Sequence, residues 1–390
     1  MVITSAVRTP VGKFMGGLST GSSPELGALA IKEALARSGV PIDAVDEVIM
    51  GNVVSAGLGQ NPARQAAIYA GIPVEVPAYT VNKVCGSGLK SVVLAAQAIK
   101  AGDAGIVVAG GMENMSMAPY ILRNARTGYR LGDGKIVDAM VYDGLWDKYN
   151  DFHMGMTGEI IADKFGVERE DIDRWALRSH QRAAEAWDKG EFDEETFKIP
   201  VKVGKKELVV ERDEGIRTDT TLEKLSKLRP VFKEGGKITA GNASQISDGA
   251  SAAVVMPREE AERRGVDIMA TIRAYTSSGV APELVMYAPV PAIRHLWKKE
   301  NLSDDDIEAY EINEAFASQS VALVRELGID PEKVNVRGGA VAIGHPIGAS
   351  GTRCLTTLLH VMKHRKLHRG LVTLCLGGGN AVAMIVEMEG

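Results

Sequence analysis

One cysteine stands just before a segment that is expected to begin a helix, in the run NKVCGSG. A thiol at a helix N-terminus meets unpaired N–H groups and the positive end of the helix dipole, so we expect a lowered pKa for Cys85. Gly86 and Gly88 allow another molecule to approach the sulfur closely. The alternative is a small hydrophobic residue, the usual role of a buried cysteine. Cys354 lies among leucines at helical spacing and is interpreted as such a core residue.

A histidine lies in a glycine-rich loop, GGAVAIGHPIGASG, rather than on the periodic face of a helix. A histidine on such a loop can approach a thiol and act as the base that activates it. His345 is therefore a candidate partner of Cys85.

A polar pair follows an expected strand in the run EINEAFA. Asn313 can orient a water or donate to a developing oxyanion, and Glu314 can fix that geometry from behind. Helix capping by Asn313 is the alternative, and it is favoured if the segment is taken alone.

A second candidate thiol, Cys375, precedes three glycines in LCLGGG at the end of an expected strand. A thiol beside backbone N–H groups can act as an acid or base next to an oxyanion hole, to which Gly377 would contribute. A strand-core cysteine followed by a tight turn is the alternative, and by itself the simpler one.

An internal duplication is expected to bring these residues together. Helix, strand, helix and strand patterns recur in the same order in both halves, and Asn52 to Gly88 spans 36 residues where Asn313 to Gly351 spans 38. Alternating strands and helices favour an α/β fold whose sheets are covered on both faces. The segments that carry the pattern begin at Pro24, Asp46, Gly86 and Gly105 in the first half and at Pro282, Ile307, Gly348 and Gly370 in the second.

An insertion is expected in the first half, because the strand-like return at 250–256 stands far along the chain from the strand at 105–111. The intervening residues, roughly 116–245, are rich in charge and contain a helix pattern from Asp171 and short strand patterns near Val201 and Leu208. A lobe beside the loop ends of a sheet is a common place to hold a large ligand.

Composition excludes several classes of protein. The 45 basic and 50 acidic residues give a net charge of −5, so nucleic acid is not an expected partner. Three cysteines, an odd number, argue against a disulfide framework. The start, MVITSAVRTPVGK, has no secretory signal pattern, and the apolar stretch 370–386 is too short and glycine-rich to span a membrane. A cytoplasmic protein without membrane association is predicted.

Four motifs together resemble those of the thiolase family, of the acetyl-CoA acetyltransferase type: VNKVCGSGLK, INEAFA, GGAVAIGHPIGASGTR and CLGGGNAVA. The resemblance runs from Ile3 to the C-terminus. It implies a five-layer α/β/α/β/α sandwich built from two βαβαβαββ domains. The implied division is an N-terminal domain of 1–115 plus 246–267, an inserted loop domain of 116–245 and a C-terminal domain of 268–390.

The resemblance also implies a reaction, the reversible Claisen condensation of two acetyl-CoA to acetoacetyl-CoA and CoA. Cys85, activated by His345, would become an acyl-thioester, and Cys375 would remove a proton from the second acetyl-CoA. His345 and a water held by Asn313 would stabilise the enolate oxygen. The N–H groups of Cys85 and Gly377 would stabilise the tetrahedral oxyanion.

Binding roles follow from the same resemblance. No tightly bound cofactor and no metal are implied; coenzyme A and acetyl-CoA are substrates, and residues 116–141 resemble a loop that joins a homotetramer. Arg217 suits the nucleotide end, because a guanidinium pairs with phosphate and stacks on rings, although a solvated surface arginine is its alternative role. The residues implied to bind CoA are Leu145, His153, Met154, Arg217, Ala240, Ser244, Ala315, Phe316 and Ser350.

Two other functions remain open. One is a broader 3-ketoacyl-CoA thiolase of fatty-acid degradation; Tyr287 stands where a small residue is expected near the acyl pocket, whereas the run from His153 to Gly155 resembles the short-chain type. The other is a non-catalytic acyl-binding subunit, which should lack a thiol or the histidine. A decarboxylating ketoacyl synthase is disfavoured, because it does not need a second reactive thiol.

Glycine makes up 43 of the 390 residues, and about a quarter of them fall in the expected catalytic loops. Such loops bring backbone close to a thioester. A β-branched residue in place of Gly344 or Gly377 is therefore expected to impair turnover more than folding.

Overall fold

The computed structural model describes residues 1–203 and 206–389. The first helix, α1 (Ser23–Ser38), begins at a capping box. The Ser22 side chain accepts from the backbone N–H of Glu25, and the Glu25 side chain accepts from the backbone N–H of Ser22. Gly39, in the left-handed region at φ 71°, ends that helix. Short-range signals of this kind explain why the expected and observed elements coincide closely.

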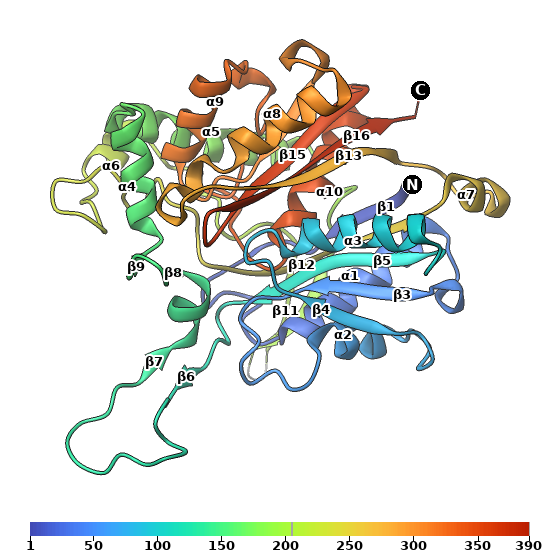
Figure 1. Cartoon of the computed structure of the whole chain (residues 1–390), viewed down its shortest axis with the longest axis horizontal. Helices are drawn as coiled ribbons and strands as arrows, with labels where there is room; N and C mark the ends of the chain where they lie inside the picture. The colour runs from blue at the N-terminus through green and yellow to red at the C-terminus, as the bar shows by residue number, and fades with distance from the viewer. Residues whose placement is uncertain (204–205, 390) are drawn as a thin grey trace.

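A ten-stranded sheet runs through the described residues (Figure 1). Its two halves join where β1 and β13 pair over only two residues each. Most of the N-terminal strands lie at one end of the sheet and the C-terminal strands at the other. Along the sheet the order is β14 (Ala309–Ile312), β15 (Arg369–Leu376), β16 (Asn380–Met388), β13 (Ala270–Gly279), β1 (Val2–Arg8), β12 (Ser247–Met256), β5 (Val107–Asn114), β3 (Glu47–Gly51) and β4 (Ala78–Val81), with β2 (Gly12–Lys13) on β12.

The N-terminal half has the order β1, α1, β3, α2, β4, α3, β5 and β12, which is the expected βαβαβαββ pattern. The C-terminal half differs at one place: its third strand is reduced to a single bridge between Val334 and Tyr310. Asn335 ends that strand early because its backbone turns to φ 48° and its side chain bonds both backbone groups of Ile312. The helices are α1 (Ser23–Ser38), α2 (Pro62–Ala70), α3 (Ser87–Ala101), α7 (Arg258–Arg264), α8 (Pro289–Glu300), α9 (Ala317–Leu327) and α10 (Ser350–Arg365).

Five layers result. α1 and α2 cover the outer face of the N-terminal half of the sheet, α3 and α10 lie between the two halves, and α8 and α9 cover the outer face of the C-terminal half (Figure 1). One apolar core contains residues of α3, α10 and strands from both halves. Cys354 of α10 is fully buried in this core, as interpreted from its spacing. The expected α/β/α/β/α sandwich is confirmed.

The two central helices touch through glycine. A Cβ on Gly351 would lie 2.2 Å from the backbone nitrogen of Leu89, and one on Gly88 would lie 2.9 Å from that of Thr352. No side chain fits at these points, so both helices can bring their N-termini to one place. Gly88 and Gly351, which end the two repeated spacings in the sequence, are therefore the residues at which the two helices cross. This crossing places the loops at the two helix N-termini close together.

The long segment between β5 and β12 lies outside the main sheet, although these two strands pair with each other as neighbours. Its β6–β7 hairpin projects away from the body (Figure 1). Arg8 of β1 anchors the segment through fully buried ion pairs with Glu195, at 2.6 Å, and Asp213, at 2.7 Å. Its elements are β6 (Tyr120–Ile121), β7 (Val137–Asp138), β8 (Trp146–Asp147), β9 (Phe152–His153), α4 (Gly155–Lys164), α5 (Arg169–Asp188), β10 (Ile199–Val203), β11 (Lys206–Val210) and α6 (Leu222–Ser226).

The described residues lack both a membrane-crossing helix and a metal-binding cluster. Within 1–203 and 206–389, no helix is long and apolar enough to cross a membrane. The same residues contain no group of three or more histidine, cysteine and acidic side chains placed to hold a metal ion.

Candidate active site

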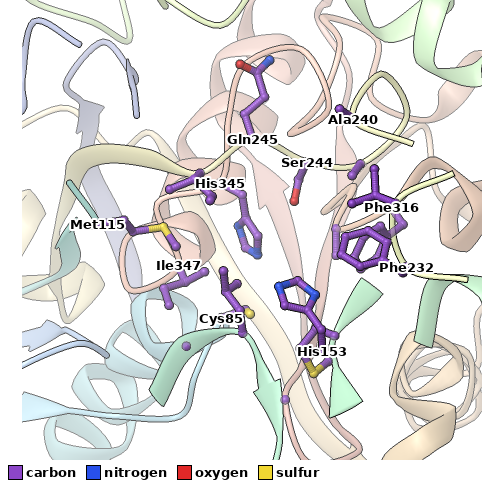
Figure 2. A pocket seen from close by; sticks show the side chains of 18 of the residues that line it. Cys85, Met115, His153, Phe232, Ala240, Ser244, Gln245, Phe316, His345 and Ile347 are labelled. Atoms are coloured by element: carbon purple, nitrogen blue, oxygen red, sulfur yellow. The ribbon is translucent and has the colours of Figure 1, made fainter. Parts of the chain in front are cut away.

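A cavity of about 480 Å³ lies where the catalytic loops of both halves meet the inserted segment. Cys85, His345, Cys375 and Gly377 all line it. Figure 2 shows Cys85 and the His345 ring pointing into the same space, with His153 opposite them. The four motif loops, separated by up to 290 residues (375 − 85), therefore meet on one cavity.

A strained turn presents Cys85. The residue before it, Val84, has φ 48°, a conformation that a β-branched residue rarely adopts. The Ser87 hydroxyl holds the turn by accepting from the N–H of Lys83 and donating to the carbonyl of Val84. α3 begins at Ser87, as expected, so Cys85 lies directly at its N-terminus.

The pKa of Cys85 moves opposite to the sequence expectation. Burial raises the pKa of its thiol to about 12, although the N–H groups of Gly377 and of Cys85 itself act in the other direction. These two backbone N–H groups therefore stabilise the thiolate less than the loss of water destabilises it. The resting sulfur is a neutral thiol, and a base must take its proton when it reacts.

His345 lines the same cavity and is in the neutral form that can accept this proton. Burial, and secondarily the charge of Arg353, lower its pKa to about 3, so the imidazole is neutral at ordinary pH. Its Nδ1 lies 2.6 Å from the Ser350 hydroxyl, which donates its own proton to the Pro346 carbonyl at 2.8 Å. Nδ1 must therefore carry the hydrogen, and Nε2 has its lone pair available to accept a proton.

Ser350 was expected to bind CoA, and the structure places it elsewhere. It is fully buried beneath His345 and does not line the cavity. As the first residue of α10, its side chain turns back to Pro346 one turn earlier, which holds it behind the histidine.

Asn313 directly follows β14, and its Nδ2 lies 3.4 Å from the Nε2 of His345. The expectation that it caps a helix is wrong, because α9 begins only at Ala317, with Phe316 in the capping position. Glu314 does brace the loop from behind, accepting from Trp175 at 2.8 Å and Ser179 at 2.7 Å. Asn313 is thus free to direct its amide at the histidine.

Cys375 is the last but one residue of β15, 2% exposed and facing the cavity. Burial and the nearby Cys85 raise the pKa of this thiol as well. Its sulfur lies 3.6 Å from Oε1 of Gln319 and 3.8 Å from the sulfur of Met286. Sequence reasoning missed Gln319 and Met286, because nothing in the local pattern shows which side chains face a strand end.

The far end of the cavity is formed largely by the inserted segment. His153 stacks on Phe232 with ring centroids 4.8 Å apart, and Phe232 meets Phe316 edge-on (Figure 2). Lys13 and Arg217 add positive charge. The residues expected to bind CoA that do line the cavity are Leu145, His153, Met154, Arg217, Ala240, Ser244, Ala315 and Phe316; Lys13 and Phe232 were missed.

Tyr287, expected near the acyl pocket, is not part of the cavity wall. It stacks on Phe165 at 5.3 Å and its hydroxyl lies 3.2 Å from Glu326. The neighbouring Val285 and Met286 line the cavity instead, because a tight helical turn over Pro282–Tyr287 directs them inward. The unusual residue therefore does not by itself set the acyl-chain length.

Comparison with known families decides the family. The model of the thiolase N-terminal domain matches residues 1–259, and that of the thiolase C-terminal domain matches 266–388. The chain belongs to the thiolase family. The resemblance in its four motifs is thereby confirmed over nearly the whole chain.

Similar thiolases are known from several bacteria. A protein of Cupriavidus necator named acetyl-CoA acetyltransferase is 52% identical, with 100% of this chain and 99% of that protein covered. An acetyl-CoA acetyltransferase of Escherichia coli is 51% identical, with 99% of this chain and 98% of that protein covered. The crystal structure of the Bacillus anthracis acetyl-CoA acetyltransferase superposes with a TM-score of 0.98 at 42% identity, covering 100% of this chain and 98% of that one.

The raised thiol pKa predicts how this thiolase responds to iodoacetamide. Because the folded pKa of Cys85 is about 12, the thiolate fraction should rise about tenfold per pH unit between pH 7 and 9 without levelling off. Alkylation rates measured by peptide mass spectrometry should follow that slope. A plateau below pH 8 would show instead a thiolate held by a charged histidine. Acetyl-CoA should protect Cys85, while the fully buried Cys354 should stay unlabelled.

Two loop glycines should respond differently to valine. A Cβ at Gly377 would lie 3.2 Å from Cγ1 of Val84, so Gly377→Val should press on the nucleophile turn and lower kcat by about tenfold or more with a small change in Tm. Gly344 has φ 116°, and a Cβ there would lie 2.4 Å from the Ser247 hydroxyl. Gly344→Val should therefore reduce the folded fraction itself, against the sequence expectation. Kinetics and thermal melts of both variants separate the two effects; equal melting losses would contradict the prediction for Gly377.

Proposed function

We propose that this thiolase is an acetyl-CoA acetyltransferase that forms and cleaves acetoacetyl-CoA through an acyl-Cys85 intermediate. The observation that carries the proposal is the meeting of two thiols and a neutral histidine on one cavity whose far end is cationic and aromatic. Relatives named acetyl-CoA acetyltransferase that align over the full length support it. A non-catalytic subunit is disfavoured, because both thiols and the histidine are present.

In the first half-reaction, Nε2 of His345 accepts the Cys85 proton as the sulfur attacks the thioester carbonyl of acetyl-CoA. The N–H groups of Cys85 and Gly377, which already point at the sulfur, stabilise the oxyanion. Collapse of the tetrahedral intermediate breaks the bond to the CoA sulfur, which leaves with the proton from His345. The product is acetyl-Cys85 and free CoA.

In the second half-reaction, Nε2 of His345 accepts the proton of Cys375, and the resulting thiolate takes a proton from the methyl carbon of another acetyl-CoA. His345, now protonated on Nε2, stabilises the enolate oxygen together with a water held by Asn313. The carbanion then attacks acetyl-Cys85, whose thiolate leaves and regains a proton from His345. Acetoacetyl-CoA is released, and the reverse sequence is thiolysis.

CoA occupies the end of the cavity formed by the inserted segment. Phe232, His153 and Phe316 offer an aromatic wall to the pantetheine chain, and Arg217 and Lys13 offer cations to the phosphates. CoA thus enters as a substrate rather than a resident cofactor. The division of the chain at 115, 245 and 267, a homotetramer joined through residues 116–141 and a cytoplasmic location belong to the same proposal.

The activity is tested by CoA-dependent cleavage of acetoacetyl-CoA compared with a longer 3-ketoacyl-CoA. Met286 and Val285 close the wall next to Cys375, which favours the short substrate. A kcat/KM at least tenfold higher for acetoacetyl-CoA supports the proposal. Equal or faster cleavage of the longer substrate would instead identify a broad 3-ketoacyl-CoA thiolase, and cleavage of neither would refute both.

A further inference from the structure

Gln319 is a buried polar residue to which the reaction above gives no role. It lies on α9, and its side chain has no exposure to solvent. Its Oε1 is 3.6 Å from the sulfur of Cys375, within reach of a hydrogen bond from the thiol. Within the described part of the chain, its Nε2 has no hydrogen-bond partner. An unpaired amide N–H in an interior normally costs about 1–3 kcal/mol, so this arrangement requires a reason.

The amide offers opposite groups to the two forms of the thiol. A neutral thiol has a hydrogen to donate, and the amide oxygen accepts it. A thiolate can only accept, and the amide N–H₂ is the matching donor. Half a turn about the last side-chain bond of Gln319 exchanges the two groups at the same position. The Met286 sulfur, 3.8 Å from the Cys375 sulfur, can accept weakly from the thiol but has no hydrogen to donate to a thiolate.

The exchange of amide groups affects the stability of the Cys375 thiolate because this sulfur is buried. Cys375 is 2% exposed, so water is poorly placed to stabilise a thiolate there. The other titratable group acting on it is Cys85, whose charge would oppose a second thiolate. Gln319 is the polar side chain bonded to the Cys375 sulfur in the described structure.

We propose that Gln319 is a positioning residue for Cys375, whose amide accepts from the thiol and, after half a turn, donates to the thiolate; the inference rests on the proposed function. During enolate formation the proton passes from the acetyl-CoA methyl carbon to the Cys375 sulfur, and the C–H electron pair becomes the enolate. Gln319 itself gains and loses no proton. It acts on the second half-reaction alone, because in the described structure its side chain bonds Cys375 and makes no hydrogen bond to Cys85.

Gln319→Met, which keeps the length and removes both polar groups, tests this with trideuterated acetyl-CoA. Acetylation of Cys85, followed as the burst of CoA release, should stay within about twofold of wild type. Washout of deuterium from the methyl group into water should fall about tenfold or more, as expected for loss of one hydrogen bond to a charged group. The deuterium isotope effect on condensation should rise, because proton transfer becomes slower than the other steps.

Ser320→Ala is the matched control. Ser320 is the next residue on α9 and is equally buried, and its hydroxyl has no hydrogen-bond partner, the Cys375 sulfur included, among the described residues. It should leave washout and the isotope effect unchanged.

The outcomes separate the two proposals. Equal loss of acetylation and washout in Gln319→Met, or wild-type washout, would overturn the role of Gln319 while leaving the thiolase reaction standing. A wild-type enzyme that neither becomes acetylated nor exchanges deuterium would overturn the proposed function itself. If Gln319→Met does not fold, Gln319→Leu repeats the test with a smaller apolar side chain.

Discussion

Cys85→Ala is expected to lower CoA-dependent cleavage of acetoacetyl-CoA by about 10⁴-fold or more, because it removes the sulfur that faces the backbone N–H groups of Cys85 and Gly377, and the remaining thiol, Cys375, is assigned to proton transfer. The fold should survive, since Cys85 is only half-buried and its turn is held by Ser87. Steady-state thiolysis and intact-mass detection of the acetyl adduct measure the effect. Neither turnover nor adduct should remain above background.

The third cysteine supplies the control for that experiment. Cys354→Ser keeps a polar group within reach of Arg353 and Asn313, the two contacts of the native sulfur. It should retain turnover within a few-fold and still form the adduct. Near-normal turnover by Cys85→Ala would refute the mechanism outright.

Cys375→Ser is expected to separate the two half-reactions. A serine hydroxyl is far less acidic than a thiol and cannot serve as the base, so condensation and deuterium washout should fall about 10³-fold. Acetylation of Cys85 needs His345 rather than Cys375 and should continue, so the acetyl-enzyme should accumulate. Mass spectrometry of the protein after mixing with acetyl-CoA detects that species. Loss of the adduct together with washout would place Cys375 in the first half-reaction and contradict the assignment.

The raised pKa values of both thiols set a requirement that links the two experiments. Each sulfur must exchange its proton with another group during the reaction, since neither rests as a thiolate near neutral pH.

Sequence alone was sufficient for the layered fold and for the positions of the reactive groups. Apolar strands and a repeated spacing are short-range signals, so they predicted alternating strands and helices in two similar halves. The βαβαβαββ order and the five layers were implied by the resemblance of the motifs to those of thiolases. The glycines around Cys85, His345 and Cys375 marked loops that approach one another closely. The shortening of the third strand in the C-terminal half could not be predicted from the sequence, because it depends on how Asn335 bonds to Ile312.

The tertiary structure decided the protonation and the contacts of the site residues, because both depend on which side chains lie next to each other. It reversed the expected pKa shift of Cys85, because burial outweighs the backbone N–H groups of Gly377 and Cys85. It moved Ser350 from a substrate contact to a support of His345 and turned Tyr287 away from the cavity. It also placed Gln319 against Cys375 from another helix. Desolvation and side-chain pairing are set by neighbours distant along the chain, so a linear pattern can name the reactive residues but cannot determine their protonation or their partners.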